Sequence, residues 1–348
     1  MRTRDDVMGM RMPLLPLLSL LPLLALLALA ACTRADADDD DLAPPRVERA
    51  AEAGGVATGW SDELHFVRTV GGFDGPESVK YDPDQDCFFI SNQTGPGSAH
   101  DGNGYISRVD AKSPTASSVF AVGGKNGVVL DSPKGITLHG DTLWTADIDK
   151  LRAFDRRSGL PLATIDFSSL GAVQLNDLMI APDGSIHVTD TGIIMSPKGV
   201  IYTGHDRIYA VGPNRAITVV AEGTQLQQPN GIAWDSAGTR WIVVSFATYN
   251  GEVAAMPDKS SARTVLWRSA HGNFDGVEVL PNGDILFASW ADSSVHLLSK
   301  GRERQLVHQV PDPADIGVDT RRNRLAIPLT TLGQVQLWDL GRIGRRTR

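Results

Sequence analysis

Short apolar stretches separated by turn sequences recur along the chain after residue 60. Residues 186–189 form one such β-rich run, and the turn signal Pro182-Asp183-Gly184 separates it from the apolar run before it. A third run of the same kind follows in each unit, as at residues 105–109. No part of this region sustains the 3.6-residue apolar period of an amphipathic helix. The pattern therefore predicts an all-β fold built from short strands.

A four-residue phrase opens each unit and occurs six times. The phrases are Pro76-Glu77-Ser78-Val79, Pro133-Lys134-Gly135-Ile136, Leu175-Asn176-Asp177-Leu178, Pro229-Asn230-Gly231-Ile232, Phe274-Asp275-Gly276-Val277 and Pro313-Ala314-Asp315-Ile316. Four short strands in a repeat of about 40–50 residues are typical of a β-propeller blade. The last repeat ends after its third strand, and a strand at residues 65–70 can supply the fourth, which removes an exposed sheet edge. We predict a six-bladed β-propeller over residues 61–348, closed by an N-terminal strand that completes the last blade.

The N-terminus has the pattern of a secretion signal. Three arginines precede an apolar, Leu- and Ala-rich stretch at residues 14–31, which ends in small residues before Cys32. This ending resembles the bacterial lipoprotein box, in which the cysteine is acylated and becomes the first mature residue. We therefore expect a signal peptide at residues 1–31, lipidation of Cys32, and a periplasmic lipoprotein anchored in the outer membrane, because Thr33 rather than Asp follows. An uncleaved membrane helix is the alternative, since 18 apolar residues can just span a bilayer.

Composition narrows the classes that remain. Residues 32–60 include the run Asp36-Ala37-Asp38-Asp39-Asp40-Asp41 and are predicted to be a disordered acidic tether. Hydrophobic residues make up 42% of the chain, enough for a sizeable core, and the net charge of −8 gives no basic field for nucleic acid. Two cysteines are too few for a disulfide framework or a zinc cluster. We expect a monomer whose only membrane contact is its lipid anchor.

The second residue of each opening phrase lies where the first strand of a blade enters the central channel. We call this end of the channel the mouth, and we call these six residues the ring: Glu77, Lys134, Asn176, Asn230, Asp275 and Ala314. Two carboxylates and two carboxamides thus converge at one place. Hard oxygen donors carrying about two negative charges suit Ca²⁺, with Mg²⁺, Mn²⁺ and Zn²⁺ as alternatives. The competing interpretation is that Asn and Asp only cap turns here.

These phrases resemble those of the senescence marker protein (regucalcin)/gluconolactonase/luciferin-regenerating-enzyme family over residues from about 63 to 340, and Phe274-Asp275-Gly276-Val277 matches the family's fifth-repeat phrase. The resemblance implies a six-bladed, calcium-dependent hydrolase of a lactone or ester. It implies metal ligation by Glu77, Asn176, Asn230 and Asp275. It also implies that Asp275 acts as general base or nucleophile.

The sequence departs from the family at two positions. Gln174 stands where the sugar-lactone members have Arg, and Lys134 stands where paraoxonase-like enzymes have His. Lys134 could hold an anionic group of the substrate or pair with Asp177 or Glu77. The further candidates for the substrate pocket are Asp177, Gln174, His271 and Asp315.

Two functions from different classes fit this pattern. The first is the metal-dependent hydrolase, and the second is a non-catalytic propeller similar to NHL-repeat proteins that binds a ligand or protein partner in the cell envelope. The phrase opening with Pro229-Asn230-Gly231 would suit an NHL repeat as well. The four-donor ring favours the hydrolase, because a pure scaffold has no need for Glu77 and Asp275 at equivalent positions.

Overall fold

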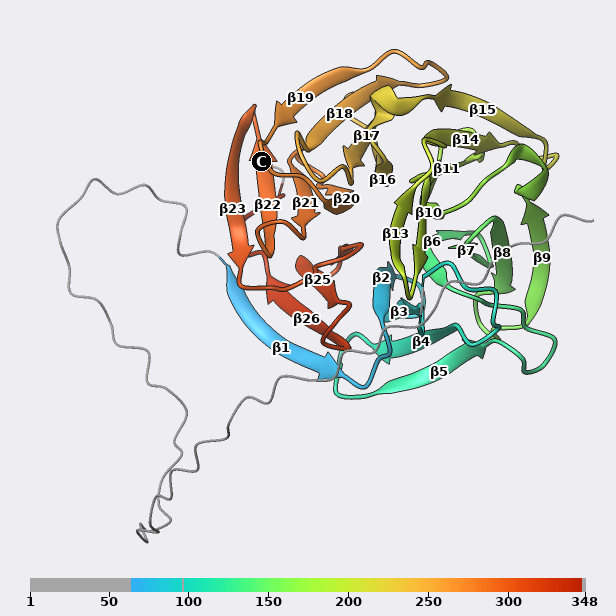
Figure 1. The fold of residues 1–348 in the computed structure, drawn as a ribbon. Helices are drawn as coiled ribbons and strands as arrows, with labels where there is room; N and C mark the ends of the chain where they lie inside the picture. Colours follow the sequence, from blue (N-terminus) through green and yellow to red (C-terminus); the bar gives the residue numbers. More distant parts are fainter. Residues whose placement is uncertain (1–63, 96, 346–348) are drawn as a thin grey trace, which may run out of the picture. The chain divides into compact units, whose positions relative to one another are not determined.

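The computed structural model describes residues 64–95 and 97–345, which form six four-stranded antiparallel sheets around a central axis (Figure 1). The predicted six-bladed β-propeller is confirmed. The predicted signal peptide, Cys32 and the acidic tether lie outside the described residues. Within the described residues, no helix has the length and apolar character needed to cross a membrane.

The first three blades occupy residues 76–222. Blade 1 consists of β2 (Pro76–Asp82), β3 (Cys87–Asn92), β4 (Tyr105–Asp110) and β5 (Ser117–Val122). Blade 2 consists of β6 (Pro133–His139), β7 (Thr142–Asp147), β8 (Lys150–Asp155) and β9 (Pro161–Asp166). Blade 3 consists of β10 (Leu175–Ile180), β11 (Ile186–Asp190), β14 (Arg207–Val211) and β15 (Ile217–Glu222). A separate two-stranded hairpin, β12 (Ile193–Ser196) and β13 (Gly199–Tyr202), is inserted between the second and third strands of blade 3.

The other three blades complete the circle. Blade 4 consists of β16 (Pro229–Asp235), β17 (Arg240–Ser245), β18 (Glu252–Pro257) and β19 (Thr264–Arg268). Blade 5 consists of β20 (Phe274–Val279), β21 (Ile285–Ser289), β22 (Ser294–Ser299) and β23 (Arg302–His308). Blade 6 consists of β24 (Gly317–Asp319), β25 (Arg324–Leu329), β26 (Gln334–Asp339) and β1 (His65–Gly71). Two single turns of 3₁₀ helix, Ser168–Leu170 and Thr224–Leu226, precede blades 3 and 4.

The N-terminal strand closes the propeller as predicted. β1 pairs antiparallel with β26, from His65 opposite Asp339 to Gly71 opposite Gln334. The outer edge of blade 6 is therefore made by residues that precede blade 1 in the chain. This arrangement joins both ends of the described chain in one sheet and ties the last blade to the first.

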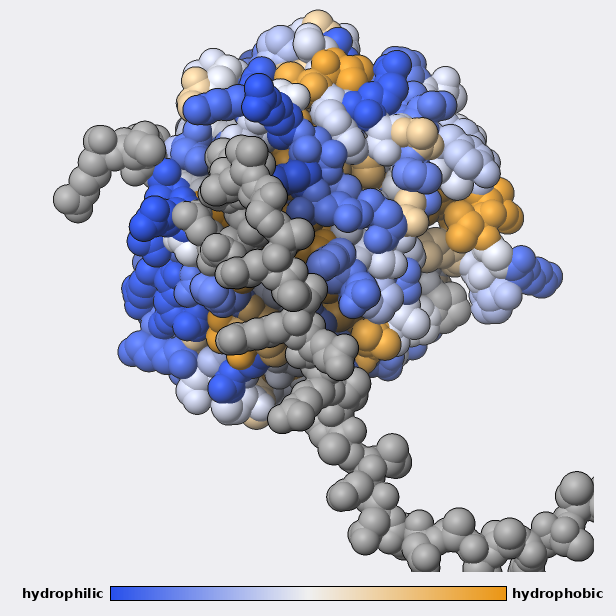
Figure 2. All heavy atoms as spheres, turned by 90° about the vertical axis from the view of Figure 1, so that its left-hand side faces the viewer, coloured by the Kyte–Doolittle hydropathy of each residue, from blue (hydrophilic) through white to orange (hydrophobic). Residues whose placement is uncertain are grey.

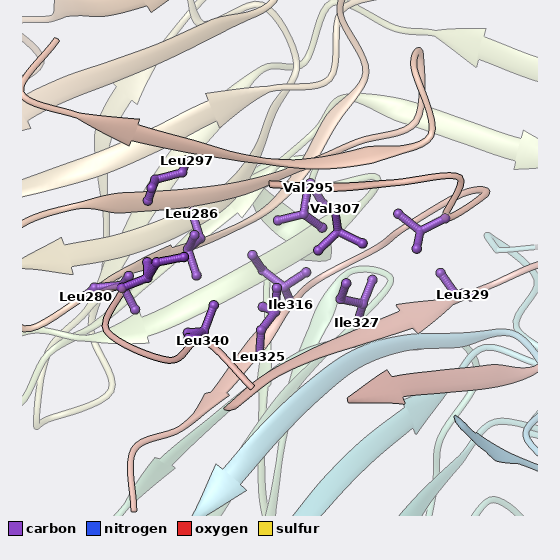
Figure 3. Packing of buried hydrophobic residues seen from close by; sticks show 13 residues of the cluster. Leu280, Leu286, Val295, Leu297, Val307, Ile316, Leu325, Ile327, Leu329 and Leu340 are labelled. Atoms are coloured by element: carbon purple, nitrogen blue, oxygen red, sulfur yellow. The ribbon is translucent and has the colours of Figure 1, made fainter. Parts of the chain in front are cut away.

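The hydrophobic core is divided among the contacts between neighbouring blades. Six apolar clusters are found among the described residues, and each combines side chains from two adjacent blades. The cluster between blades 5 and 6 contains Leu286, Val295, Ile316 and Leu325 (Figure 3). Because both faces of a blade are covered, strands such as β3 and β21 are buried at every position.

Glycine allows the first strands to approach one another at the mouth. A Cβ atom on Gly231 would lie 2.4 Å from the carbonyl oxygen of Asp275, and one on Gly276 would lie 2.4 Å from the amide nitrogen of Ile316. Both distances are too short for real side chains. Glycine at these positions therefore places the ring residues of neighbouring blades side by side.

Candidate functional site

A β-bulge sits at the ring position of each of the first five blades. In blade 1, Pro76 pairs with Asn92 and Val79 pairs with Ile90, so Glu77 and Ser78 together face a single residue of β3. The same shift in register occurs in blades 2 to 5 at the equivalent residues. A bulge locally turns a strand and redirects a side chain. The first strands therefore share one irregular geometry at the positions that sequence analysis selected.

Four ring residues each leave one buried side-chain oxygen without a hydrogen-bond partner. The side chains are buried, and in the described part of the chain nothing bonds Glu77 Oε2, Asn176 Oδ1, Asn230 Oδ1 or Asp275 Oδ1. A buried polar atom without a partner costs about 1–3 kcal/mol, so such atoms are uncommon. Four such atoms at equivalent positions leave oxygens at the mouth that are available to a ligand.

The amide of Asn176 is oriented by Thr191, which directly follows β11 in the same blade. Its Nδ2 donates a hydrogen bond of 3.0 Å to Thr191 Oγ1, which leaves Oδ1 as the unpaired atom. Thr191 in turn donates to the carbonyl oxygen of Pro229 at 3.0 Å. Thr191 therefore links the ring residue of blade 3 to the start of β16 and to the blade that carries Asn230.

Lys134 lies beside the two acidic ring residues. Its Nζ is 3.8 Å from Glu77 Oε1 and donates a hydrogen bond of 2.9 Å to Gln93 Oε1. The Lys134 side chain is buried, so its charge acts with little screening by solvent. Of the two interpretations left open by sequence, the structure shows a contact with Glu77. Gln93 was not predicted, and a single glutamine at the end of a strand carries no sequence signal.

Burial raises the pKa of both ring carboxyls. The pKa of Glu77 rises to about 8, mainly by burial, and the Lys134 ammonium opposes that rise while Asp275 adds to it. Burial also raises the pKa of Asp275 to about 7, against the lowering effects of Lys134 and of the Trp290 indole. Asp275 raises the pKa of Glu77, and Lys134 lowers the pKa of both carboxyls. Glu77, Asp275 and Lys134 therefore form one electrostatic cluster. A cation at this cluster would favour the ionised carboxylates.

Asp177 and Asp315 bridge blades rather than face open space. Asp177 accepts hydrogen bonds from the backbone amides of Leu178 and Ile232, both at 2.7 Å. Ser78 donates to Asp315 Oδ2 at 2.5 Å. Ile232 belongs to blade 4 and Ser78 to blade 1. The carboxylates of these two predicted pocket residues are therefore joined to neighbouring blades at the mouth.

Gln174 joins two long loops. Its Oε1 accepts a hydrogen bond of 2.7 Å from Ser98, and its Nε2 donates at 3.3 Å to the carbonyl oxygen of Gly97. The backbone amide of Met195, in β12, donates to Ser98 Oγ at 2.9 Å. Gln174 is fully buried, so its side chain holds the β3–β4 loop against the hairpin.

His271 is placed away from these contacts. It is exposed, and its backbone forms an isolated bridge with Tyr249 in the β17–β18 loop. Within the described residues, no hydrogen bond or ion pair joins the His271 side chain to the ring.

Metal-ligating groups are limited in kind at the ring. No cluster of three or more His, Cys, Asp or Glu side chains suited to a metal occurs within residues 64–95 and 97–345. The ring itself offers two carboxylates and two carboxamides. Such a set fits a hard, oxygen-seeking cation and not a soft one.

Comparison with known proteins identifies relatives of this propeller. Residues 76–316 match the sequence model described as the SMP-30/Gluconolactonase/LRE-like region. No curated protein matches the chain.

Solved structures share the fold at low sequence identity. A gluconolactonase from Xanthomonas campestris superposes with a TM-score of 0.59 at 18% identity, covering 77% of this chain and 86% of that one. A luciferin-regenerating enzyme superposes with a TM-score of 0.56 at 11% identity, covering 77% of this chain and 91% of that one. A chain of a nidogen/laminin complex gives 0.52 at 15% identity, with coverage of 67% and 80%.

Proposed function

Because this chain belongs to the SMP-30/gluconolactonase/LRE-like family, we propose that it is a lactonase-type hydrolase of a lactone or ester that requires a divalent cation at the channel mouth. The observation that carries the proposal is the set of four unpaired buried oxygens on Glu77, Asn176, Asn230 and Asp275. Ca²⁺ would suit this set of two carboxylates and two amide oxygens, because it is a hard cation that prefers oxygen ligands. Mg²⁺, Mn²⁺ and Zn²⁺ are the alternatives that a metal titration separates.

The ring residues then divide the work of hydrolysis. A divalent cation supplies polarisation of the substrate carbonyl and stabilisation of the negative charge that develops on its oxygen. Glu77, Asn176 and Asn230 provide ligands, and Asp275 provides a ligand and the reactive carboxylate. Asp275 accepts a proton from the attacking water and returns it to the leaving alkoxide, which yields the acid and the alcohol. Lys134 and the Trp290 indole stabilise the ionised form of Asp275.

The first experiment is a screen of purified protein against lactones and esters with Ca²⁺ and with a chelator. We expect turnover of at least one substrate class, lost on chelation and restored by Ca²⁺. Metal occupancy is measured separately by isothermal titration calorimetry. If the protein binds metal and hydrolyses nothing in the screen, the NHL-like binding module is the better explanation of the ring.

We also propose that the protein is a lipoprotein of the bacterial cell envelope, on the basis of the sequence pattern ending at Cys32. Acylation with two or more chains gives stable attachment, since each buried CH₂ contributes about 0.8 kcal/mol. Cys32→Ser is expected to leave the protein unprocessed or released into the soluble fraction. Mass spectrometry of the wild-type N-terminus checks this, and an unmodified residue 32 in a wholly soluble protein contradicts it.

A further inference from the structure

Exposed apolar side chains gather at the mouth end of the propeller. Of the thirteen large hydrophobic residues that are exposed in the described chain, five lie on outer strands and one lies in a turn at the opposite end. The other seven lie at the mouth end, in the inserted hairpin or in loops between strands: Val129, Leu170, Val200, Ile201, Tyr202, Tyr249 and Leu332. In the side view of Figure 2 the surface is mainly hydrophilic, and its apolar residues form separate patches. This uneven distribution sets the mouth end apart from the rest of the propeller.

The β12–β13 hairpin carries three of these seven residues and is fixed beside the ring. At its base, Thr191 accepts the hydrogen bond from Asn176. In its first strand, Met195 is held through Ser98 to Gln174. These hydrogen bonds hold the hairpin in place beside the ring.

One face of this hairpin is mainly apolar and extends toward the ring. Ile193 pairs with Tyr202 and Met195 pairs with Val200, so these four side chains share a face. Met195 Sδ lies 3.1 Å from the position that a Cβ on Gly97 would take, and that position is 2.8 Å from Gln93 Oε1. Gln93 accepts the hydrogen bond from Lys134, the neighbour of Glu77.

The polar groups at this face are bonded to protein groups, and the Tyr202 hydroxyl donates a hydrogen bond of 3.1 Å to Asp206 Oδ2. The Gln174 amide is already bonded to Ser98 and Gly97 and is fully buried. Val200, by contrast, is 63% exposed on the apolar face. The one polar group that these four side chains contribute, the Tyr202 hydroxyl, is already bonded to Asp206, so the exposed surface of Val200 suits an alkyl or aryl chain better than a polyhydroxylated substrate.

We propose that the face made by Met195 and Val200 binds the apolar chain of the substrate, so that the protein prefers lactones or esters with an alkyl or aryl substituent over sugar lactones. This inference rests on the proposed hydrolase function and adds the substrate class. Burying one methylene contributes about 0.8 kcal/mol, which corresponds to up to about fourfold in kcat/KM. A series of increasing chain length therefore reports directly on this face.

The experiment compares γ-butyrolactone, γ-octalactone, γ-decalactone and glucono-1,5-lactone on the Ca²⁺-loaded full-length protein. We expect kcat/KM to rise with chain length and to be lowest for the sugar lactone. Val200→Ser is expected to reduce the ratio of kcat/KM for γ-decalactone to kcat/KM for γ-butyrolactone by at least about threefold. Val119→Ser is the matched control, because Val119 is 64% exposed on β5, an outer strand away from the mouth.

A binding measurement separates recognition from turnover. The lactam 5-hexyl-2-pyrrolidinone resists hydrolysis. Its Kd for the protein is measured by isothermal titration calorimetry and compared with that of 2-pyrrolidinone. We expect the hexyl compound to bind at least about tenfold more tightly and to lose that advantage in Val200→Ser.

The outcomes distinguish the two proposals. Turnover with no dependence on chain length, or a preference for the sugar lactone, overturns the substrate class and leaves the hydrolase intact. Absence of any turnover by metal-loaded protein overturns the hydrolase itself. If Val200→Ser lowers co-sedimentation with phosphatidylcholine vesicles and leaves the chain-length ratio unchanged, the face contacts lipid and the inference about substrate is wrong.

Discussion

Asp275→Asn is expected to lower kcat by at least about 100-fold at saturating Ca²⁺, the scale of a lost general base. The amide keeps the shape of the side chain and one oxygen donor but removes the negative charge. Folding should be preserved, because burial already raises the pKa of Asp275 to about 7 and so favours a neutral side chain in the absence of metal. Metal affinity should fall only modestly, since three other ligands remain.

Steady-state kinetics on the best substrate from the screen measures this effect. Asp258→Asn is the matched control, because Asp258 is exposed in the β18–β19 turn at the end opposite the mouth. Glu77→Gln should act mainly through metal affinity and be partly rescued by excess Ca²⁺. Full activity of Asp275→Asn at saturating metal would show that Asp275 is a ligand only. A single turnover in H₂¹⁸O tests the alternative role of nucleophile, because ¹⁸O enters the Asp275 carboxylate only if that carboxylate has attacked the substrate.

Removal of metal is expected to make the protein less stable as the pH rises. The pKa of Glu77 is raised from 4.5 to about 8 and that of Asp275 from 3.8 to about 7. Between the ordinary and the raised pKa values, the two carboxyls bind more protons in the folded apo-protein than in the unfolded chain. The free energy of unfolding of the apo-protein therefore falls as the pH rises from about 4 to about 8. Bound Ca²⁺ favours the ionised carboxylates and should oppose this fall. The gap in Tm between the two forms should therefore widen with pH.

Differential scanning calorimetry with Ca²⁺ and with a chelator, from pH 5 to pH 8, tests this expectation. At a ligand concentration of 100 Kd, binding stabilises the fold by about 2.7 kcal/mol. Each kcal/mol moves Tm by roughly 2–4 °C in domains of 150–250 residues. Asn230→Ala should abolish the Ca²⁺-dependent gap, whereas Asn282→Ala, in an exposed turn at the opposite end, should retain it. Superimposable melting curves of the wild type with and without Ca²⁺ would argue against a metal at the ring.

The architecture was predictable because it is repeated. Each blade needs the same turn, the same apolar second strand and the same opening phrase, so six weak local signals reinforce one another. The closing strand was also predictable, since the last repeat lacked one strand and residues 65–70 had the required pattern. Its pairing with β26 confirms that prediction.

The partners of the ring residues were not predictable in the same way. The sequence shows that Asp177 and Glu77 are acidic. It does not show that the backbone amide of Ile232 donates a hydrogen bond to Asp177 Oδ2, whereas Glu77 Oε2 has no hydrogen-bond partner among the described residues. That difference arises from the approach of one blade to the next. The bulge at the opening phrase of each of the first five blades is likewise invisible in the sequence, because it arises where two residues of one strand face a single residue of its partner.

The sequence by itself determined the number of blades, the closure and the identity of the residues that meet at the mouth, because local turn chemistry and period repeat along the chain. Only the tertiary structure decided which of those residues keep a free oxygen, since this depends on contacts between segments far apart in sequence. It tied Gln174 to Ser98 and Met195, and it placed Lys134 next to Glu77. It also set an apolar hairpin face beside a polar ring. The chemistry of the site follows from that juxtaposition of distant segments.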